Sequence, residues 1–298
     1  MAYSPYVLVI LCSLVLSGLC ESSLSNQQGV RFIETKNGVY DCVDFYKQPT
    51  FLQYPLLKNF TSKVAVVHTT NLGMKFYGVN GSPSLYKPAA QDTQWSSTRI
   101  KLLNGPDSIE AGWMVNPGVF KDNEAHFYAK FTAGGKECIN LQCPGFVQVA
   151  KDAPLGSVPK IYSVIGGVQK LWNISIDKHQ DDGNWWLSIN NDKNLVGYWP
   201  KELFTTLTES ANQVEWGGEI GNPGLLDPPT EMGNGMKASY DTSNSACIVH
   251  ATVVDESFKN VNPQETLKVW DCESLYTVLD DGYQSEYLGR LIFYGGSL

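Results

Sequence analysis

The chain has 298 residues and is acidic, with 30 Asp and Glu against 22 Lys and Arg and a formal net charge of −8. It contains no run of basic residues and no basic amphipathic helix. Because binding to phosphate backbones needs a basic surface, this charge argues against a nucleic-acid partner.

The N-terminal segment predicts the compartment. Residues from Tyr6 to Leu19 form an almost wholly apolar run that ends in small residues before Glu21. The run is too short to span a membrane and has the length of a signal-peptide core. We expect residues 1–20 to be a signal peptide, cleaved after Cys20. Since no second long apolar run follows, we expect a secreted, extracellular monomer with no membrane association after signal removal.

Cysteines and sequons agree with an oxidising, extracellular environment. Two of the seven cysteines, Cys12 and Cys20, lie in the signal segment, which leaves five in the mature chain. The simplest account pairs Cys138 with Cys143 across a short loop and Cys247 with Cys272 across a longer one. It leaves Cys42 unpaired. The sequons predict glycosylation at Asn59, Asn80 and Asn173.

The chain changes character near Lys63. Residues 21–62 hold two Pro-containing motifs, and the rest of the chain is a succession of short β-type runs separated by Gly, Pro, Asn and Asp. One weak helix is expected at Lys201–Glu209. Strands are predicted at Val64–Thr70, Lys75–Val79, Ile100–Leu103, Ile109–Val115, His126–Thr132, Phe146–Ala150, Val158–Ile165, Val168–Ile176, Trp185–Ile189, Val196–Trp199, Val214–Ile220, Cys247–Val254, Leu267–Cys272 and Leu288–Tyr294.

So many short strands with turn residues between them predict an all-β domain, a sandwich or a barrel. The sequence shows no internal repeat and no low-complexity linker. Residues 63–298 are within the usual range for a single domain of this kind.

The usual hydrolase motifs are missing. There is no Gly-x-Ser-x-Gly and no His-Glu-x-x-His, and no Ser or Cys nucleophile stands beside a histidine. The Cys-x4-Cys spacing of Cys138 and Cys143 lacks a matching His pair, so it does not favour a zinc site. We expect no metal and no cofactor, and only carboxylates remain for catalysis.

A series of motifs runs along nearly the whole secreted chain. The motifs are Asp41-Cys-Val-Asp-Phe-Tyr-Lys-Gln-Pro49, Pro55-Leu-Leu-Lys-Asn59, Ile109-Glu-Ala-Gly-Trp-Met-Val115, Cys138-Ile-Asn-Leu-Gln-Cys-Pro-Gly-Phe146, Gly183-Asn-Trp-Trp-Leu187, Val196-Gly-Tyr-Trp-Pro-Lys-Glu-Leu-Phe204, Val214-Glu-Trp-Gly-Gly-Glu-Ile220, Met232-Gly-Asn-Gly235, Leu279-Asp-Asp-Gly-Tyr283 and Phe293-Tyr-Gly-Gly296. In this order they resemble the neprosin family of secreted, plant-type glutamic peptidases. The first two lie in residues 21–62 and look like that family's activation-peptide signature.

The resemblance implies a catalytic dyad of Glu110 and Glu219 on an antiparallel β-sandwich of two sheets, preceded by a short pro-segment. It implies a zymogen in which residues 21–62 inhibit the catalytic domain, residues 63–298. It further implies cleavage after proline under acidic conditions, with proline-containing polypeptides as substrates. The two disulfides proposed above would also be those of the family.

The chemistry of a carboxyl pair fits this reading. Two carboxylates a few ångströms apart titrate together, with one pKa raised and the other lowered. The ionised member takes a proton from water. The protonated member donates a hydrogen bond to the scissile carbonyl and later a proton to the leaving nitrogen. The residues alone leave open which glutamate is the base. In extended strands Gly112 shares the face of Glu110 and Gly217 that of Glu219, which would let a substrate backbone approach.

Tryptophans supply the other candidate substrate contacts. The adjacent indoles of Trp185 and Trp186 must point to opposite faces of a strand, so that one of them is available to a cleft. Trp113 and Trp216 point away from the glutamates and are expected to buttress the strands.

Two other functions compete with the peptidase. A catalytically silent secreted module would bind cell-wall glycans or proline-rich proteins with its aromatic face, because a fold does not guarantee turnover. A glycosidase would use the same carboxyl pair on sugars. Retention of both Glu110 and Glu219 favours the peptidase over the binding module.

Overall fold

The computed structural model describes residues 31–35, 38–42, 61–70, 73–91, 93–190, 194–222, 228–271 and 274–297. The chain divides into two compact units, Met1–Thr61 and Ser62–Leu298. Of the first, the structure describes an antiparallel hairpin, β1 (Arg31–Thr35) and β2 (Gly38–Cys42). Within the described ranges, no helix has the length and apolar character needed to cross a membrane.

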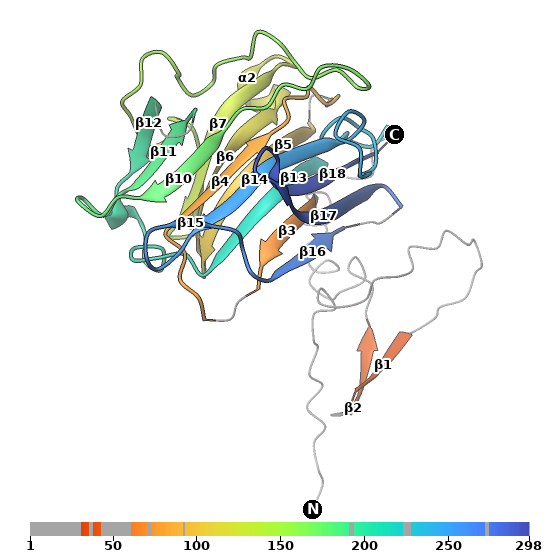
Figure 1. The fold of residues 1–298 in the computed structure, drawn as a ribbon, viewed down its shortest axis with the longest axis horizontal. Helices are drawn as coiled ribbons and strands as arrows, with labels where there is room; N and C mark the ends of the chain where they lie inside the picture. Colours follow the sequence, from red (N-terminus) through yellow and green to blue (C-terminus); the bar gives the residue numbers. More distant parts are fainter. Residues whose placement is uncertain are drawn as a thin grey trace, which may run out of the picture. The chain divides into compact units, whose positions relative to one another are not determined.

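The second unit is a β-sandwich of two antiparallel sheets, which confirms the predicted fold class (Figure 1). The first sheet has seven strands in the order β16 (Thr266–Trp270), β3 (Thr61–Thr69), β13 (Gln213–Asn222), β5 (Trp95–Asn104), β6 (Asp107–Val115), β7 (Ala125–Ala133) and β8 (Lys136–Ile139). We call it the seven-stranded sheet.

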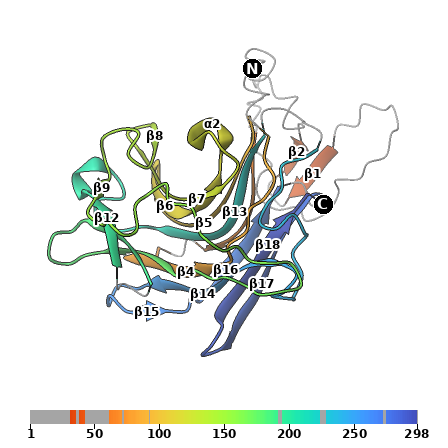
Figure 2. The ribbon, with the colours of Figure 1, turned by 90° about the horizontal axis from the view of Figure 1, so that it is seen from above.

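The second sheet has nine strands. Its order is β17 (Tyr276–Ser285), β18 (Gly289–Gly296), β14 (Ala246–Val254), β4 (Gly78–Pro83), β10 (Ile174–Lys178), β11 (Trp185–Ile189), β12 (Asn194–Trp199) and β9 (Val147–Gln148), with β15 (Asn260–Val261) paired to β14. In Figure 2, β5, β6, β7 and β13 lie in one layer and β4, β14 and β18 in the other.

The core fills the space between the sheets. Alternate residues of β5, β6 and β13 point into it, and the largest are aromatic, as Trp216 and Trp113 illustrate at 0% and 3% exposed. Trp216 also joins the layers, since its Nε1 donates to the carbonyl of Asn80 on β4 at 2.9 Å. The expectation that Trp113 and Trp216 buttress the strands is confirmed. The other residues of these strands therefore point away from the core.

Two predicted elements are wrong. Residues 158–165 form no strand; single hydrogen bonds, such as that from the Ser163 amide to the Leu85 carbonyl, hold this segment. The predicted helix at Lys201–Glu209 is only a 3-10 turn, η3 (Lys201–Leu203). The amides of Thr205, Thr206 and Leu207 donate to the buried Asp107 carboxylate instead of to helical carbonyls.

Of the predicted strands only Trp185–Ile189 matches in both bounds, and five strands, β1, β2, β8, β15 and β17, were not predicted. Strand β4 begins at Gly78, β9 covers only Val147–Gln148, and β10 begins at Ile174. Strand β8 was not expected, and β17 was missed because Asp280-Asp281-Gly282 resembles a turn; a register shift at that point accommodates it inside the strand. One short helix, α2 (Pro117–Phe120), follows β6.

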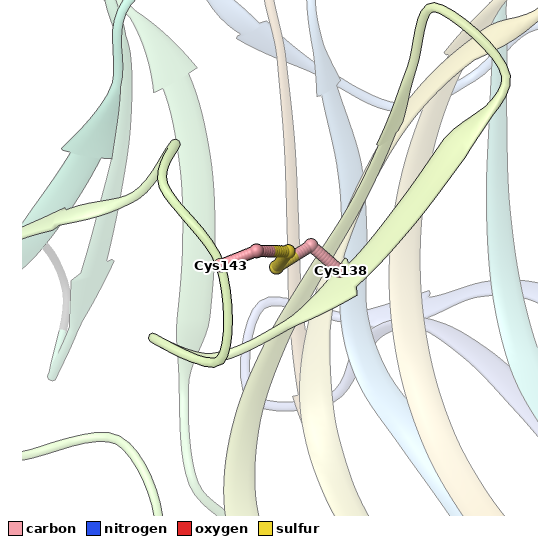
Figure 3. Close-up of a disulfide and its surroundings, with 2 residues drawn as sticks. All are labelled: Cys138 and Cys143. Carbon is pink, nitrogen blue, oxygen red and sulfur yellow. A yellow bond between two sulfur atoms is a disulfide. The ribbon is translucent and has the colours of Figure 1, made fainter.

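Of the two predicted disulfides, one is confirmed. Cys138 and Cys143 are bonded and close the loop after β8 (Figure 3). Cys247 forms no disulfide with any residue that the structure describes; it is a buried thiol on β14, packed with Val249, Leu291 and Phe293 in a small apolar cluster. Its expected partner, Cys272, lies outside the described residues, so the Cys247–Cys272 bond stays a prediction. Cys42 lies in β2.

Candidate active site

The candidate site lies on the face of the seven-stranded sheet that points away from the core. Strands β13, β5, β6 and β7 are neighbours there, and their register places residues far apart in sequence in two adjacent rows. The first row is Glu215, Lys101, Glu110 and Lys130. The second row is Gly217, Arg99, Gly112 and Tyr128.

Glu110 is surrounded by donors. Its side chain is 1% exposed, and the Tyr128 hydroxyl donates to its Oε1 at 2.9 Å. Lys130 Nζ lies 3.3 Å from Oε1, and Lys101 Nζ lies 3.3 Å from Oε2. Burial raises the pKa of Glu110, but the charges of Lys130, Lys101 and Arg99 outweigh it and hold that pKa far below its usual range. Glu110 is therefore ionised.

Arg99 joins Glu110 to Glu219. Its Nε lies 3.0 Å from Oε2 of Glu219 and 3.9 Å from Oε2 of Glu110, while its Nη1 lies 2.8 Å from Oε2 of Glu215. The Arg99 side chain is 2% exposed. Burial lowers the pKa of Arg99, and the charges of Glu219, Glu215 and Glu110 more than reverse the effect. One guanidinium nitrogen thus faces both glutamates that the sequence singled out.

The cluster balances its charges. Three cations meet three carboxylates, and the least buried side chain among them, Lys101, is 16% exposed. A fourth carboxylate, that of the exposed Glu137, lies 3.5 Å from Lys130 Nζ at the edge of the cluster. Burial raises the pKa of Glu215, but Arg99 and Lys101 bring it below its usual value. An isolated buried charge is costly, so such a group is stable only with its partners in place. This face of the seven-stranded sheet therefore carries a polar site that contains both positive and negative side chains.

One oxygen in this cluster is left available. Oε2 of Glu110 is buried and accepts no hydrogen bond from the part of the chain that the structure describes, although two cations lie near it. Buried carboxylate oxygens are normally hydrogen-bonded. This oxygen lies 3.9 Å from the same Arg99 nitrogen that contacts Oε2 of Glu219.

The two glycines lie beside Arg99 but have a structural reason of their own. A Cβ on Gly217, whose φ is +145°, would stand 2.2 Å from the carbonyl oxygen of Ala65 on β3. A Cβ on Gly112 would stand 1.8 Å from the carbonyl oxygen of Thr98 on β5. Close contact between strands thus accounts for both glycines without a substrate.

The predicted tryptophans do not reach the glutamates. Trp185 and Trp186 lie on β11 in the nine-stranded sheet. Trp185 is fully buried in the core and donates to the carbonyl of Leu207. Trp186 points to the other face, where it stacks on His179 at 5.0 Å and packs against Tyr198.

A different tryptophan stands beside the cluster. Trp95 begins β5 on the same face as Arg99 and is partly exposed. Its indole lies against the backbone of Gly221, since a Cβ there would stand 2.0 Å from Nε1 of Trp95. Gly221 is two residues beyond Glu219 on β13, and Lys130 Nζ lies 5.8 Å from the centre of the Trp95 ring. Trp95 therefore lies against β13 near Glu219 and close to Lys130, the ion-pair partner of Glu110.

Two of the three predicted glycosylation sites lie in the part of the chain that the structure describes. Asn80 on β4 and Asn173 just before β10 are both partly exposed, and Asn59 lies outside the described residues. The side chain of Asn80 donates to Asn260 at 2.7 Å, and that of Asn173 donates to Ser82 at 3.3 Å.

Sequence reasoning missed most of the cluster. Arg99 and Lys101 alternate with the apolar Ile100 and Leu102, a pattern that places both cations on the face away from the core. That signal was available. Their pairing with Glu110 and Glu219 depends on the strand order, which local pattern does not contain.

The chain is thus an antiparallel β-sandwich protein that carries a buried cluster of carboxylates and cations on one sheet. The neprosin family model matches residues 92–297, so the chain belongs to the neprosin family. Solved structures with a similar fold include scytalido-glutamic peptidase with a transition state analog inhibitor, at 8% identity and TM-score 0.43, covering 80% of this chain and 100% of that chain.

Two further solved structures are similar to the same extent. Scytalido-glutamic peptidase with a peptide based transition state analog matches at 8% identity and TM-score 0.40. SCP-B of the Eqolisin family, in complex with the tripeptide Ala-Ile-His, matches at 7% identity and TM-score 0.40. Each comparison covers 80% of this chain and 98% of the other. These likenesses are distant, and the family assignment rests on the family model.

Proposed function

We propose that this protein is a secreted glutamic endopeptidase that cleaves after proline in acid, with Glu110 and Glu219 as its catalytic residues. The observation that carries the proposal is the approach of both glutamates to Nε of Arg99, at 3.9 Å and 3.0 Å. Membership of the neprosin family supports a peptidase.

The environments of the two glutamates suggest different roles. Glu110 has three cations near it and is held ionised, so we assign it the role of general base. Its Oε2, which accepts no hydrogen bond from the described residues, would take the proton of the attacking water. Among the described residues Glu219 contacts one cation, Arg99, and its side chain is 12% exposed, so we assign the catalytic proton to it.

The reaction then follows from these assignments. The water oxygen bonds to the scissile carbonyl carbon while one of its protons passes to Glu110. Protonated Glu219 donates a hydrogen bond to the carbonyl oxygen and then gives its proton to the leaving nitrogen as the C–N bond breaks. Glu110 then releases to solvent the proton that it took from water and Glu219 takes one up, so the pair returns to its starting state. Because the reaction needs one carboxyl group of the pair ionised and the other protonated at the same time, the proposal places activity at acid pH.

Trp95 supports the preference for proline. Its partly exposed indole borders the cluster, and the flat apolar face of an indole suits a pyrrolidine ring. Residues 1–20 as a signal peptide and residues 21–62 as an intramolecular inhibitor complete the proposal; both rest on the sequence.

The test is mass spectrometry of a proline-containing peptide incubated with the mature secreted protein between pH ~3 and ~7, a range set by the titration of carboxyl pairs. Glu110→Gln and Glu219→Gln are compared with Glu256→Gln, which changes an exposed glutamate. Acid-dependent cleavage after proline, lost in the first two and kept in the control, supports the proposal. An intact peptide at every pH, with folded protein free of its pro-segment, refutes it and favours a binding module.

A further inference from the structure

We propose that Arg99 is the positioning residue of the glutamate pair and that Glu215 is its counter-ion. In this arrangement Arg99 fixes the carboxylates of Glu110 and Glu219 relative to each other and sets the pH range of activity. Glu215 limits how much of the Arg99 charge acts on these two carboxylates. The inference rests on the proposed function and assigns it two further residues.

The sheet register explains how one side chain reaches three carboxylates. Arg99 lies between Gly217 on β13 and Gly112 on β6, so no neighbouring side chain stands beside it on either strand. Glu215 and Glu219 flank Gly217, and Glu110 is two residues before Gly112. All three glutamates are therefore diagonal neighbours of Arg99, within reach of a long side chain.

The guanidinium suits this position. It is planar and rigid, with donors fixed in direction, so a contact at one nitrogen orients the others. Glu215 binds Nη1 at 2.8 Å, which holds the plane in place, and Nε is then directed at Glu219 at 3.0 Å. A lysine at position 99 would supply the charge but not two fixed directions.

Charged and titratable groups surround the Arg99 side chain. The charged and titratable groups that face it come from its own strand and from three others: Lys101 of β5, Glu215 and Glu219 of β13, Glu110 of β6, and Tyr128 and Lys130 of β7. Among the described residues Glu215 contacts Arg99 and the side-chain amide of Gln213, with Lys101 and His68 as further groups whose charges act on it, and it has no place in the proposed reaction. We assign it the role of neutralising part of the Arg99 charge.

The proposal predicts shifts of opposite sign. Removing a cation beside a carboxylate raises the pKa of that carboxylate, so Arg99→Gln moves the pH profile of kcat/KM upward by about one unit. Removing the negative charge of Glu215 leaves more of the Arg99 charge on Glu219 and Glu110, so Glu215→Gln moves the profile downward. Arg99→Lys keeps the position of the profile and lowers kcat.

The experiment measures kcat/KM against pH on a proline-containing peptide for the wild type, these three variants and the Glu256→Gln control. Opposite shifts for Arg99→Gln and Glu215→Gln support the proposal. Reduced rates with an unmoved profile in both overturn it and leave Arg99 a structural residue. If Arg99→Gln does not fold, Glu215→Gln alone decides by the presence or absence of its downward shift. A wild type that cleaves nothing refutes the proposed function itself.

Discussion

Lys130 and Glu110 face each other across β7 and β6, with Nζ 3.3 Å from Oε1 and side chains 8% and 1% exposed. Burial lowers the pKa of Lys130, yet the charge of Glu110 brings it above its usual value. The two groups therefore hold each other ionised inside the protein.

Replacing Lys130 by Met leaves Glu110 with fewer cations. Removing one partner of a buried pair costs roughly 3–5 kcal/mol, and we expect the lower end because Lys101 and Arg99 remain. Urea unfolding at neutral pH and near pH ~4 tests this, since the cost should shrink where Glu110 of the variant takes up a proton. An equal loss at both pH values would show that Glu110 is not the cause.

Wild-type stability should depend on Glu110 in acid. The folded pKa of Glu110 is depressed, so its contribution is present above the unfolded value of about 4.5 and is lost as pH falls toward the folded one. Glu110→Gln removes this contribution. Thermal melts between pH ~5 and ~2 should therefore show a shallower acid loss for Glu110→Gln than for wild type. Parallel curves would contradict the ion-pair assignment.

Asp107 provides a stability prediction separate from catalysis. It is fully buried, and although burial raises the pKa of this carboxyl, hydrogen bonds from the amides of Thr206, Thr205 and Leu207 lower it overall. Asp107→Asn should cost about 1.5–3 kcal/mol, the scale of hydrogen bonds to a charged group. Calorimetry measures the loss, and the pH profile of cleavage should keep its position.

Trp95 should determine part of the substrate preference. Trp95→Ala removes the aromatic face beside Glu219, so KM for a proline-containing peptide should rise while that for a peptide cleaved elsewhere changes less. Gly221→Ala should act in the same direction, because the new Cβ would displace the indole. Trp186→Ala, which changes a tryptophan of the other sheet, is the matched control. A similar loss for that control would refute the assignment.

The sequence predicted the strands whose apolar and polar residues alternate. Ile109–Val115 lies within β6, and Trp185–Ile189 matches β11. It failed where long-range contacts decide the local structure. The Asp107 carboxylate, about a hundred residues away, takes the amides that a helix after Lys201 would need. At Val158–Ile165 the apolar run carries exposed side chains, as Ile161 at 60% shows, so apolar character did not mean burial.

The candidate site divides in the same way. Family motifs pointed to Glu110 and Glu219, and the register of three strands was needed to show that Arg99 lies between them. The tryptophan pair Trp185-Trp186 attracted attention as a motif, whereas the single Trp95 did not. A motif identifies residues that recur together, and only the fold shows which of them meet.

The measurement that tests the central claim most directly is a double-mutant comparison of cleavage at acid pH. If Glu110 and Glu219 act as one unit, Glu110→Gln and Glu219→Gln each abolish cleavage of a proline-containing peptide, and the double variant is no slower than either single one. Single variants that keep much of the activity, or losses that multiply in the double variant, would show that the two glutamates do not work as a pair.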